Sequence, residues 1–148
     1  MKRYQFSLES ALRARRAQEE VARQRLAEVN LRLQRARDAH AAAVQAYRAV
    51  TLSSSPLTRE SFVAHRSREL LMAEAIERAH RLVAQVEVEA SMMYTTWVDA
   101  GKQVASLERL DERRRGEWEI EVGRDEAAAV DDVVNSRWKL AGADRGML

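Results

Sequence analysis

The side chains best suited to chemistry in this sequence are three histidines, His40, His65 and His80. None of them lies in a recognisable catalytic motif. The chain has no G-x-x-x-x-G-K-[ST] phosphate loop, no G-x-G-x-x-G nucleotide fingerprint and no H-E-x-x-H zinc motif. It has no cysteine, which excludes a disulfide framework and a thiolate metal site. We therefore expect no catalytic residue, no cofactor and no metal.

Two other groups of residues could contact a ligand or a partner. The arginine run at residues 113–115 could grip phosphate, but on a helix rich in Asp and Glu such a run more often forms ion pairs one turn apart. The acidic neighbours that could take part are Glu108, Asp111, Glu112, Glu117 and Glu119. Trp97 falls on an apolar stripe and is expected in the core. Trp118 and Trp138 have no evident core to enter, so we expect them at an interface.

Long helices must position these residues. The chain of 148 residues holds five Gly and one Pro, with charged residues at 32% and aromatic residues at 5%. Such a composition is typical of long helices rather than a layered globular core. Apolar residues recur at alternating steps of three and four along both halves of the chain, for example at Leu26, Val29 and Leu33 and at Val83, Val86 and Ala90. This heptad pattern predicts helices that pack along their length.

One break divides the pattern. Residues 51–57 contain three serines and Pro56, and Ser55 with Pro56, or Thr58, can start a second helix. A connection this short joins antiparallel neighbours. We predict an all-α fold with a single domain over residues 1–148, an antiparallel coiled-coil hairpin. Its parts are helix 1 at about 7–50 with Ser7 as the cap, the tip loop at 51–57, helix 2 at about 58–138 and a frayed tail at 139–148.

The apolar stripes also predict a register. Apolar residues meet along the hairpin if the numbers of facing residues add to about 109, which places Tyr47 on Phe62, Leu12 on Trp97 and His40 on Glu69. A shift by one residue would break this match, whereas a shift by a heptad is harder to exclude. In this register helix 1 ends near residue 104 of helix 2. Residues 107–138 would then overhang without a partner in the chain.

Charge and hydropathy limit the functions that the chain could have. Residues 1–50 hold eleven Lys/Arg against five Asp/Glu, residues 51–110 seven against eight, and residues 111–148 seven against ten, which gives +6, −1 and −3. The positive charge of residues 1–50 is best explained by a helix face that is exposed to solvent. The alternative is that this face binds an anionic surface. A two-helix hairpin offers no concave pocket for a substrate, so we expect no enzyme. The sequence contains neither an apolar run of ~20 residues nor an apolar signal core, which predicts a cytosolic protein.

Three features resemble the FliJ family of flagellar type III export proteins. The first is the opening at residues 3–13 with the Arg- and Glu-rich turn at 15–20. The second is the block Leu-Glu-Arg-Leu-Asp-Glu-Arg-Arg-Arg at residues 107–115, followed by acidic helix and the pair at 131–132. The third is the chain length, with the hairpin break near one third of the chain. The resemblance covers nearly the whole chain.

The resemblance implies a non-enzymatic, cytoplasmic part of the export apparatus, associated with the cytoplasmic face of the membrane at the flagellar base. Family members are similar in shape to the central stalk of rotary ATPases. They are thought to sit in the ring of the export ATPase FliI, whose regulator is FliH, and to touch the export gate protein FlhA. They are also described as escorts for export chaperones. The resemblance implies no nucleic-acid partner and no small-molecule substrate.

The resemblance also suggests two contact surfaces. The tip surface, near the hairpin tip, is expected to meet the gate and consists of Ala43, Tyr47, Met72, Ile76 and His80. The open-end surface is expected to meet the ATPase ring and consists of Leu107, Leu110, Arg113, Arg114, Arg115 and Trp118.

Three alternatives stay open. The chain could be a generic coiled-coil adaptor that self-associates through its tail. It could be a stalk protein of the YscO group, the injectisome counterpart of FliJ, which sequence alone barely separates from FliJ. A different class is a nucleic-acid binder that uses the basic first helix, and such binding would weaken steeply with salt.

Overall fold

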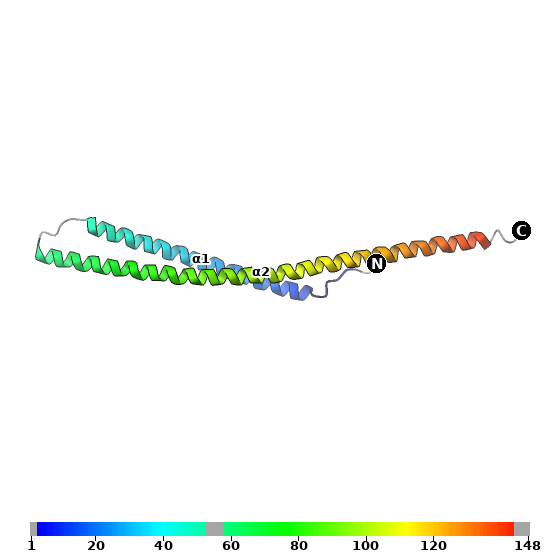
Figure 1. Cartoon of the computed structure of the whole chain (residues 1–148), viewed down its shortest axis with the longest axis horizontal. Coiled ribbons are helices and arrows are strands. Elements are labelled where there is room, and N and C mark those ends of the chain that lie inside the picture. Colours follow the sequence, from blue (N-terminus) through cyan, green and yellow to red (C-terminus); the bar gives the residue numbers. More distant parts are fainter. Residues whose placement is uncertain (1–2, 53–57, 144–148) are drawn as a thin grey trace. The chain divides into compact units, whose positions relative to one another are not determined.

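The computed structural model describes residues 3–52 and 58–143, with the side chains of these residues except at 137 and 139–143. It contains two helices, α1 at Glu9–Leu52 and α2 at Arg59–Ala143. They have 44 and 85 residues and pack against each other in opposite directions (Figure 1). The predicted all-α antiparallel hairpin with a longer second helix is therefore confirmed.

Local side chains explain where the helices begin. The Ser61 backbone N–H donates to Thr58 Oγ1 at 3.1 Å, and the Thr58 backbone N–H donates to Ser61 Oγ at 3.0 Å, so Thr58 caps α2. Because α1 begins at Glu9, the position before its first residue is Leu8 and not Ser7, which was expected to be the cap.

The helix ends differ from the predicted ends in two places. Residues 51 and 52 are helical, although they were assigned to the tip loop, and the other residues of that loop, 53–57 with Ser55 and Pro56, lie outside the described residues. At the other end α2 runs on to Ala143, past the end predicted near residue 138. Of the predicted frayed tail, residues 144–148 lie outside the described residues.

The chain divides into two compact units. The central unit is Arg15–Lys102, and the terminal unit combines Met1–Ala14 with Gln103–Leu148. Each unit therefore brings a part of the chain before the hairpin turn against a part after it.

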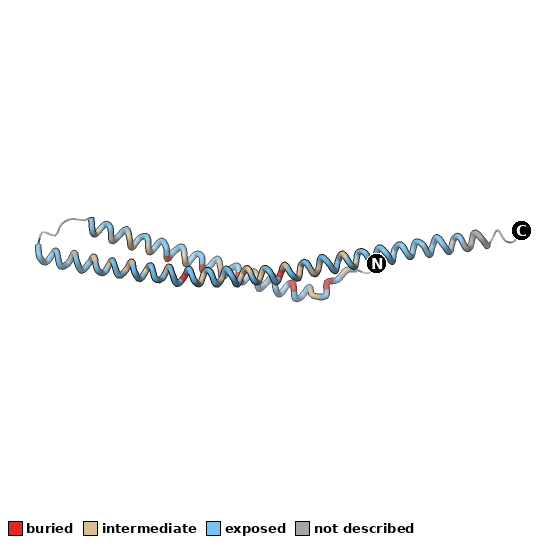
Figure 2. Tube along the Cα trace, in the orientation of Figure 1, coloured by how far each residue is buried: buried red, intermediate tan, exposed pale blue. Residues whose placement is uncertain are grey.

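In the central unit the two apolar stripes face each other. Ala22, Val29 and Ala36 of α1 are buried at heptad spacing, and Val86 of α2 is buried opposite them (Figure 2). The positions on the predicted stripes of both helices are buried or partly buried, with two exceptions. Phe62 is exposed, and so is Arg15, which falls on the stripe of α1 three residues after Leu12. The stripe positions are therefore correct for nearly the whole seam.

The register predicted for this seam is wrong. Arg37 pairs with Glu87 at 2.7 Å, Arg32 pairs with Glu89, and the His40 and His80 rings lie 5.7 Å apart, so facing numbers add to about 120 rather than about 109. The helices are displaced by about 11 residues, or three turns, from the predicted pairing. Both registers keep the apolar stripes together, because three turns return a helix to nearly the same face.

In the terminal unit the residues before α1 continue along α2. Phe6, Leu12 and Val104 form a buried cluster, and Tyr4, Leu8, Leu107 and Leu110 pack against it. The prediction that α2 lacks a partner from residue 107 onward is therefore wrong for residues 107–118, because residues 4–8, the N-terminal segment, pack against α2 as far as Trp118. The predicted contact of Leu12 with Trp97 is replaced by the contact with Val104.

Candidate partner-binding surfaces

The tip surface contains a groove that crosses both helices of the central unit. Tyr47 of α1 and Ile76 of α2 line this groove of about 660 Å³, together with Leu70, Ala73 and four charged residues of α2. Both side chains are partly buried, so each presents part of its apolar surface to the groove. The structure thus brings together two of the five residues expected to contact the gate.

The other three residues of the tip surface lie differently. Ala43 and Met72 are partly buried, and neither is among the residues that line the groove. His80 is exposed on α2 with its ring against that of His40. Exposed apolar side chains continue past the groove at Leu71 and Phe62.

A second groove was missed in the sequence. It has a volume of about 450 Å³ and lies between Arg32, Arg35 and Ala36 of α1 and Leu82 and Val86 of α2. The wrong register hid it, because the residues that line it were paired elsewhere. A small residue at Ala36, where the seam would otherwise be filled, is the sequence signal that could have indicated it.

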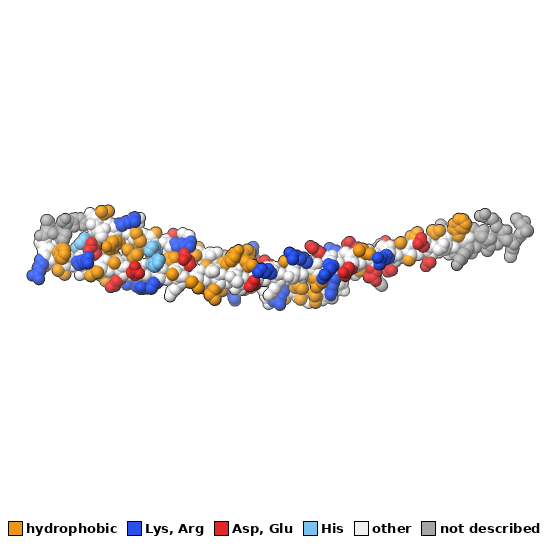
Figure 3. All heavy atoms as spheres, in the orientation of Figure 1, with side chains coloured by type: hydrophobic (Ala, Val, Ile, Leu, Met, Phe, Trp, Pro, Cys, Tyr) orange, Lys and Arg blue, Asp and Glu red, His pale blue; other side chains and the backbone are white. Residues whose placement is uncertain are grey.

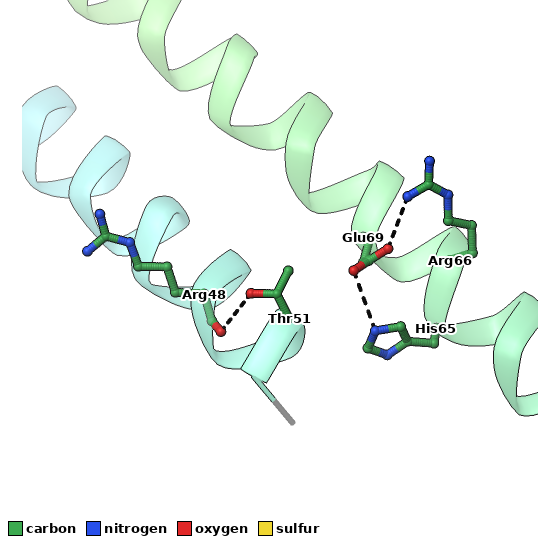
Figure 4. Close-up of polar contacts among 5 residues, drawn as sticks. All are labelled: Arg48, Thr51, His65, Arg66 and Glu69. Carbon is green, nitrogen blue, oxygen red and sulfur yellow. Dashed lines mark hydrogen bonds and ion pairs between the residues drawn. The ribbon is translucent and has the colours of Figure 1, made fainter. Parts of the chain in front are cut away.

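The histidines lie at two separate places on the seam. His65 Nε2 lies 3.5 Å from Glu69 Oε1, and Arg66 Nη1 lies 3.2 Å from Glu69 Oε2 (Figure 4). The expected contact of His40 with Glu69 is wrong, because His40 meets His80 three turns away. Within residues 3–52 and 58–136, no group of three or more His, Cys, Asp or Glu side chains could hold a metal ion.

Half of the open-end surface is covered by the chain itself. Leu107 and Leu110 pack against the cluster of Phe6, Leu12 and Val104. The Trp118 ring lies 5.8 Å from that of Tyr4, so the expectation that Trp118 has no core to enter is wrong. These three side chains are partly buried by the N-terminal segment before any partner arrives.

The arginine run turns toward the N-terminal segment. Arg114 Nη1 donates to Ser7 Oγ at 2.7 Å, and the Arg115 guanidinium lies 5.4 Å from the centre of the Tyr4 ring. Arg115 also pairs with Asp111, 3.8 Å away and one turn earlier, which is one of the predicted pairings. Arg113 is exposed. The run therefore helps to hold the chain's own N-terminal residues on α2.

Tyr4 is the centre of these contacts. Its hydroxyl donates to Asp111 Oδ1 at 2.7 Å and lies 3.2 Å from the Asp111 carbonyl oxygen. Partial burial, then the hydrogen bond to Asp111 and the charge of that carboxylate, raise the pKa of Tyr4 above its ordinary value of 10.0. The charges of Arg115 and Arg114 act in the opposite direction, and the net shift is upward.

Beyond Trp118 the helix is exposed. From residue 119 to residue 136, which we call the tail helix, Val122 alone is partly buried. The stretch carries six Asp/Glu against one Arg, and its apolar side chains include Ile120, Val130 and Val134 at 49–62% exposure (Figure 3). Trp138, just after it, is 78% exposed, in agreement with its predicted lack of a core.

Trp97 lies on the seam, as expected. It is partly buried, and its ring lies 5.9 Å from that of Tyr94. Its indole N–H is buried and has no hydrogen-bond partner among the described residues.

Neither helix, over the residues described, has a stretch that is both long and apolar enough to cross a membrane. Comparison with protein-family models, with curated proteins and with solved structures gives no match for this chain.

Proposed function

We propose that this chain is a stalk-like component of the bacterial flagellar type III export apparatus, of the FliJ kind. In this role it links the ring of the export ATPase FliI, with its regulator FliH, to the export gate FlhA, and it escorts export chaperones. It is not an enzyme and works at the cytoplasmic face of the membrane. The observation that supports this role is the unequal hairpin, in which α2 continues past Trp118 as an exposed helix with acidic and apolar side chains.

Two separate contact zones fit a linking role. The groove lined by Tyr47 and Ile76 lies in the central unit, and we assign it to the gate. The open-end surface lies in the terminal unit, and we assign it, with the tail helix, to the ATPase ring. Exposed apolar side chains at both zones are of the kind that partners cover.

The ion pairs of α1 favour a protein partner over nucleic acid. Arg32 and Arg37 pair with Glu89 and Glu87 across the seam, and Arg23 pairs with Glu20 on α1 itself at 2.8 Å. These carboxylates offset part of the positive charge that residues 1–50 would otherwise present to phosphates. Binding to DNA at low salt that weakens steeply as salt is added would favour the nucleic-acid alternative instead.

The first experiment measures ATP hydrolysis by the flagellar export ATPase of the same organism with and without the purified chain. We expect stimulation. Removal of everything from residue 107 onward would also remove Leu107 and Leu110, which pack against the cluster of Phe6, Leu12 and Val104, so point variants are better. Arg113→Glu alters an exposed arginine of the open-end surface, and Val130→Lys with Val134→Lys alters the tail helix. We expect both to reduce stimulation.

Arg48→Glu is the matched control. It makes the same charge change as Arg113→Glu, at an exposed position of α1 that belongs to neither contact zone. If all variants and the control stimulate equally, the assignment of the ring contact is wrong. If the unaltered chain neither stimulates nor binds the ATPase, the stalk proposal is wrong and a generic adaptor remains.

The second experiment measures binding to the cytoplasmic domain of the gate protein. Tyr47→Ala removes one wall of the groove and should weaken binding. Tyr94→Ala is the control, since it makes the same substitution in the same unit, outside the groove. Equal binding by the two variants would contradict the assignment of the groove to the gate.

An injectisome stalk protein of the YscO group would share this fold. The ATPase assay separates the two systems when it is repeated with an injectisome ATPase. Stimulation of the injectisome enzyme alone would replace the flagellar proposal.

A further inference from the structure

The N-terminal segment is held on α2 by side chains and hardly by its own backbone. The backbone carbonyls of residues 4–8 bond to the start of α1 and not to α2: Glu9 N–H donates to the Phe6 carbonyl at 3.2 Å in a turn, and Leu12 N–H donates to the Leu8 carbonyl at 2.9 Å in the first turn of the helix. The segment joins neither helix as a regular element. Its position on α2 therefore depends on what Tyr4, Phe6 and Ser7 contact.

Those contacts are of two kinds: Phe6 packs in an apolar cluster, and Tyr4 and Ser7 contact mainly polar side chains of α2. Phe6 is 8% exposed, in the cluster with Leu12 and Val104. Tyr4 is clasped on three sides, by Asp111 at its hydroxyl, Arg115 over its ring and Trp118 beside it. Arg114 holds Ser7. A short segment with so few contacts can open while α1 stays helical.

The surface beneath this segment has a defined chemistry. The Asp111 carboxylate accepts a hydrogen bond from a phenol, and the Arg115 guanidinium lies over an aromatic ring. The apolar side chains of Leu107, Leu110 and Trp118 complete the surface. An extended segment with an aromatic hydroxyl two residues before a second aromatic ring satisfies all three. Tyr4 and Phe6 have that spacing.

We propose that residues 4–7 form a releasable latch over a docking face of α2, and that a partner segment with the same pattern, tyrosine, any residue, aromatic, displaces it. The contacts within the terminal unit support both the latch and the sequence pattern expected of the partner segment. One step rests on the proposed function: the face is part of the open-end surface, so the displacing partner would belong to the export ATPase.

The chemistry is tested with a synthetic peptide of residues 1–12 and a control peptide that has Ala in place of its Tyr and Phe. The chain variant Tyr4→Ala, Phe6→Ala opens the face, and its helix content by circular dichroism checks the fold. We expect the variant to bind the first peptide about tenfold more tightly than the unaltered chain does, because a covered face lowers apparent affinity by the fraction of time it is open. The control peptide should not bind.

A closed form provides the opposite test. The chain has no cysteine, so Ser7→Cys with Arg114→Cys can be joined by a short bis-maleimide without side reactions at other thiols. The linked chain should lose peptide binding, whereas each single-cysteine variant treated alike should keep it. Equal affinity in the open, unaltered and linked forms, or no binding to the open form, would overturn the latch.

The same proteins separate this proposal from the proposed function. If peptide binding follows the latch but no form of the chain stimulates the export ATPase, the latch stands and the stalk role fails. If the linked chain stimulates the ATPase as well as the unlinked chain does, the displacement step is wrong, even where the peptide data support the docking face.

Discussion

At the scale of single residues, Tyr4 joins the N-terminal segment to α2. It meets Asp111, which is 107 positions away, and it also contacts Arg115 and Trp118. Asp111 falls where the heptad pattern of α2 calls for an apolar residue. The structure explains this exception, because the Asp111 carboxylate accepts a hydrogen bond from the Tyr4 hydroxyl. A polar residue on an apolar stripe is thus the sequence signal that marks the contact.

The raised pKa of Tyr4 gives a pH prediction. The folded pKa lies above the unfolded value of 10.0, so the contribution of Tyr4 to stability is complete below pH 10 and is lost as the pH rises through the folded pKa. An ultraviolet titration of tyrosinate for the unaltered chain and for Tyr4→Phe isolates this residue by difference. We expect the difference between the two titration curves, which is the signal of Tyr4, to appear above pH 10. Titration at or below pH 10 would contradict the hydrogen bond to Asp111.

At the scale of the helices, the seam of the central unit depends on small residues. Ala22 and Ala36 are 7% and 6% exposed, and they let the helices approach closely. Each buries little area, so the seam gains stability from its length rather than from a few large side chains.

Ala22→Leu should therefore destabilise the hairpin by about 1–3 kcal/mol, because the larger side chain must push the helices apart. Ala27→Leu is the control, since Ala27 is exposed and Leu is nearly as good a helix former, and its effect should stay within about 0.5 kcal/mol. Urea unfolding followed by circular dichroism measures both. A neutral or stabilising effect of Ala22→Leu would show that the seam has room.

The glycines of α2 give a prediction of the opposite sign. A Cβ at Gly123 would meet nothing within 4 Å, so Gly123→Ala should favour the tail helix by about 0.5–1 kcal/mol. Amide hydrogen exchange at neighbouring residues should slow. At Gly101 the added Cβ would lie 3.5 Å from Glu19 Oε1, an ordinary contact, which makes Gly101→Ala a control in a packed part of α2. Unchanged exchange near Gly123 would contradict the prediction.

At the scale of the whole molecule, stability should be uneven along α2. Within the central unit α2 packs on α1, and in the terminal unit it packs on residues 4–12, but from 119 to 136 its side chains are almost all exposed. Few buried contacts mean low local stability. The tail helix is therefore the part on which a partner could have the largest effect.

Hydrogen exchange followed by mass spectrometry tests this unevenness. Amides of residues 123–136 should exchange far faster than those of residues 22–36, and a bound partner should slow the former selectively. The comparison is made within one chain, so both regions experience the same conditions. Equal protection of the two regions in the isolated chain would show that something covers the tail helix.

The sequence by itself determined the elements and their inward faces. The steps of three and four residues, the break before Thr58 and the lack of Gly and Pro in α1 are local properties, and local properties decide where helices form and which stripe is apolar. Leu26, Val29, Leu33, Val83 and Val86 are on the seam as predicted. Of the tip surface, Tyr47 and Ile76 are on their predicted stripes, but their meeting at one groove depends on the register.

The tertiary structure decided the register and the course of the N-terminal segment. A heptad seam presents similar residues every few turns, so several registers join the stripes. Non-local pairs such as Arg37 with Glu87 and His40 with His80 distinguish them. Tyr4 and Phe6 lie outside any periodic pattern, and only the correct register brings Asp111 and Leu107 within their reach. The covered state of the open-end surface therefore followed from long-range packing: Asp111 marks a contact in the sequence, but the heptad pattern does not say which residue makes it.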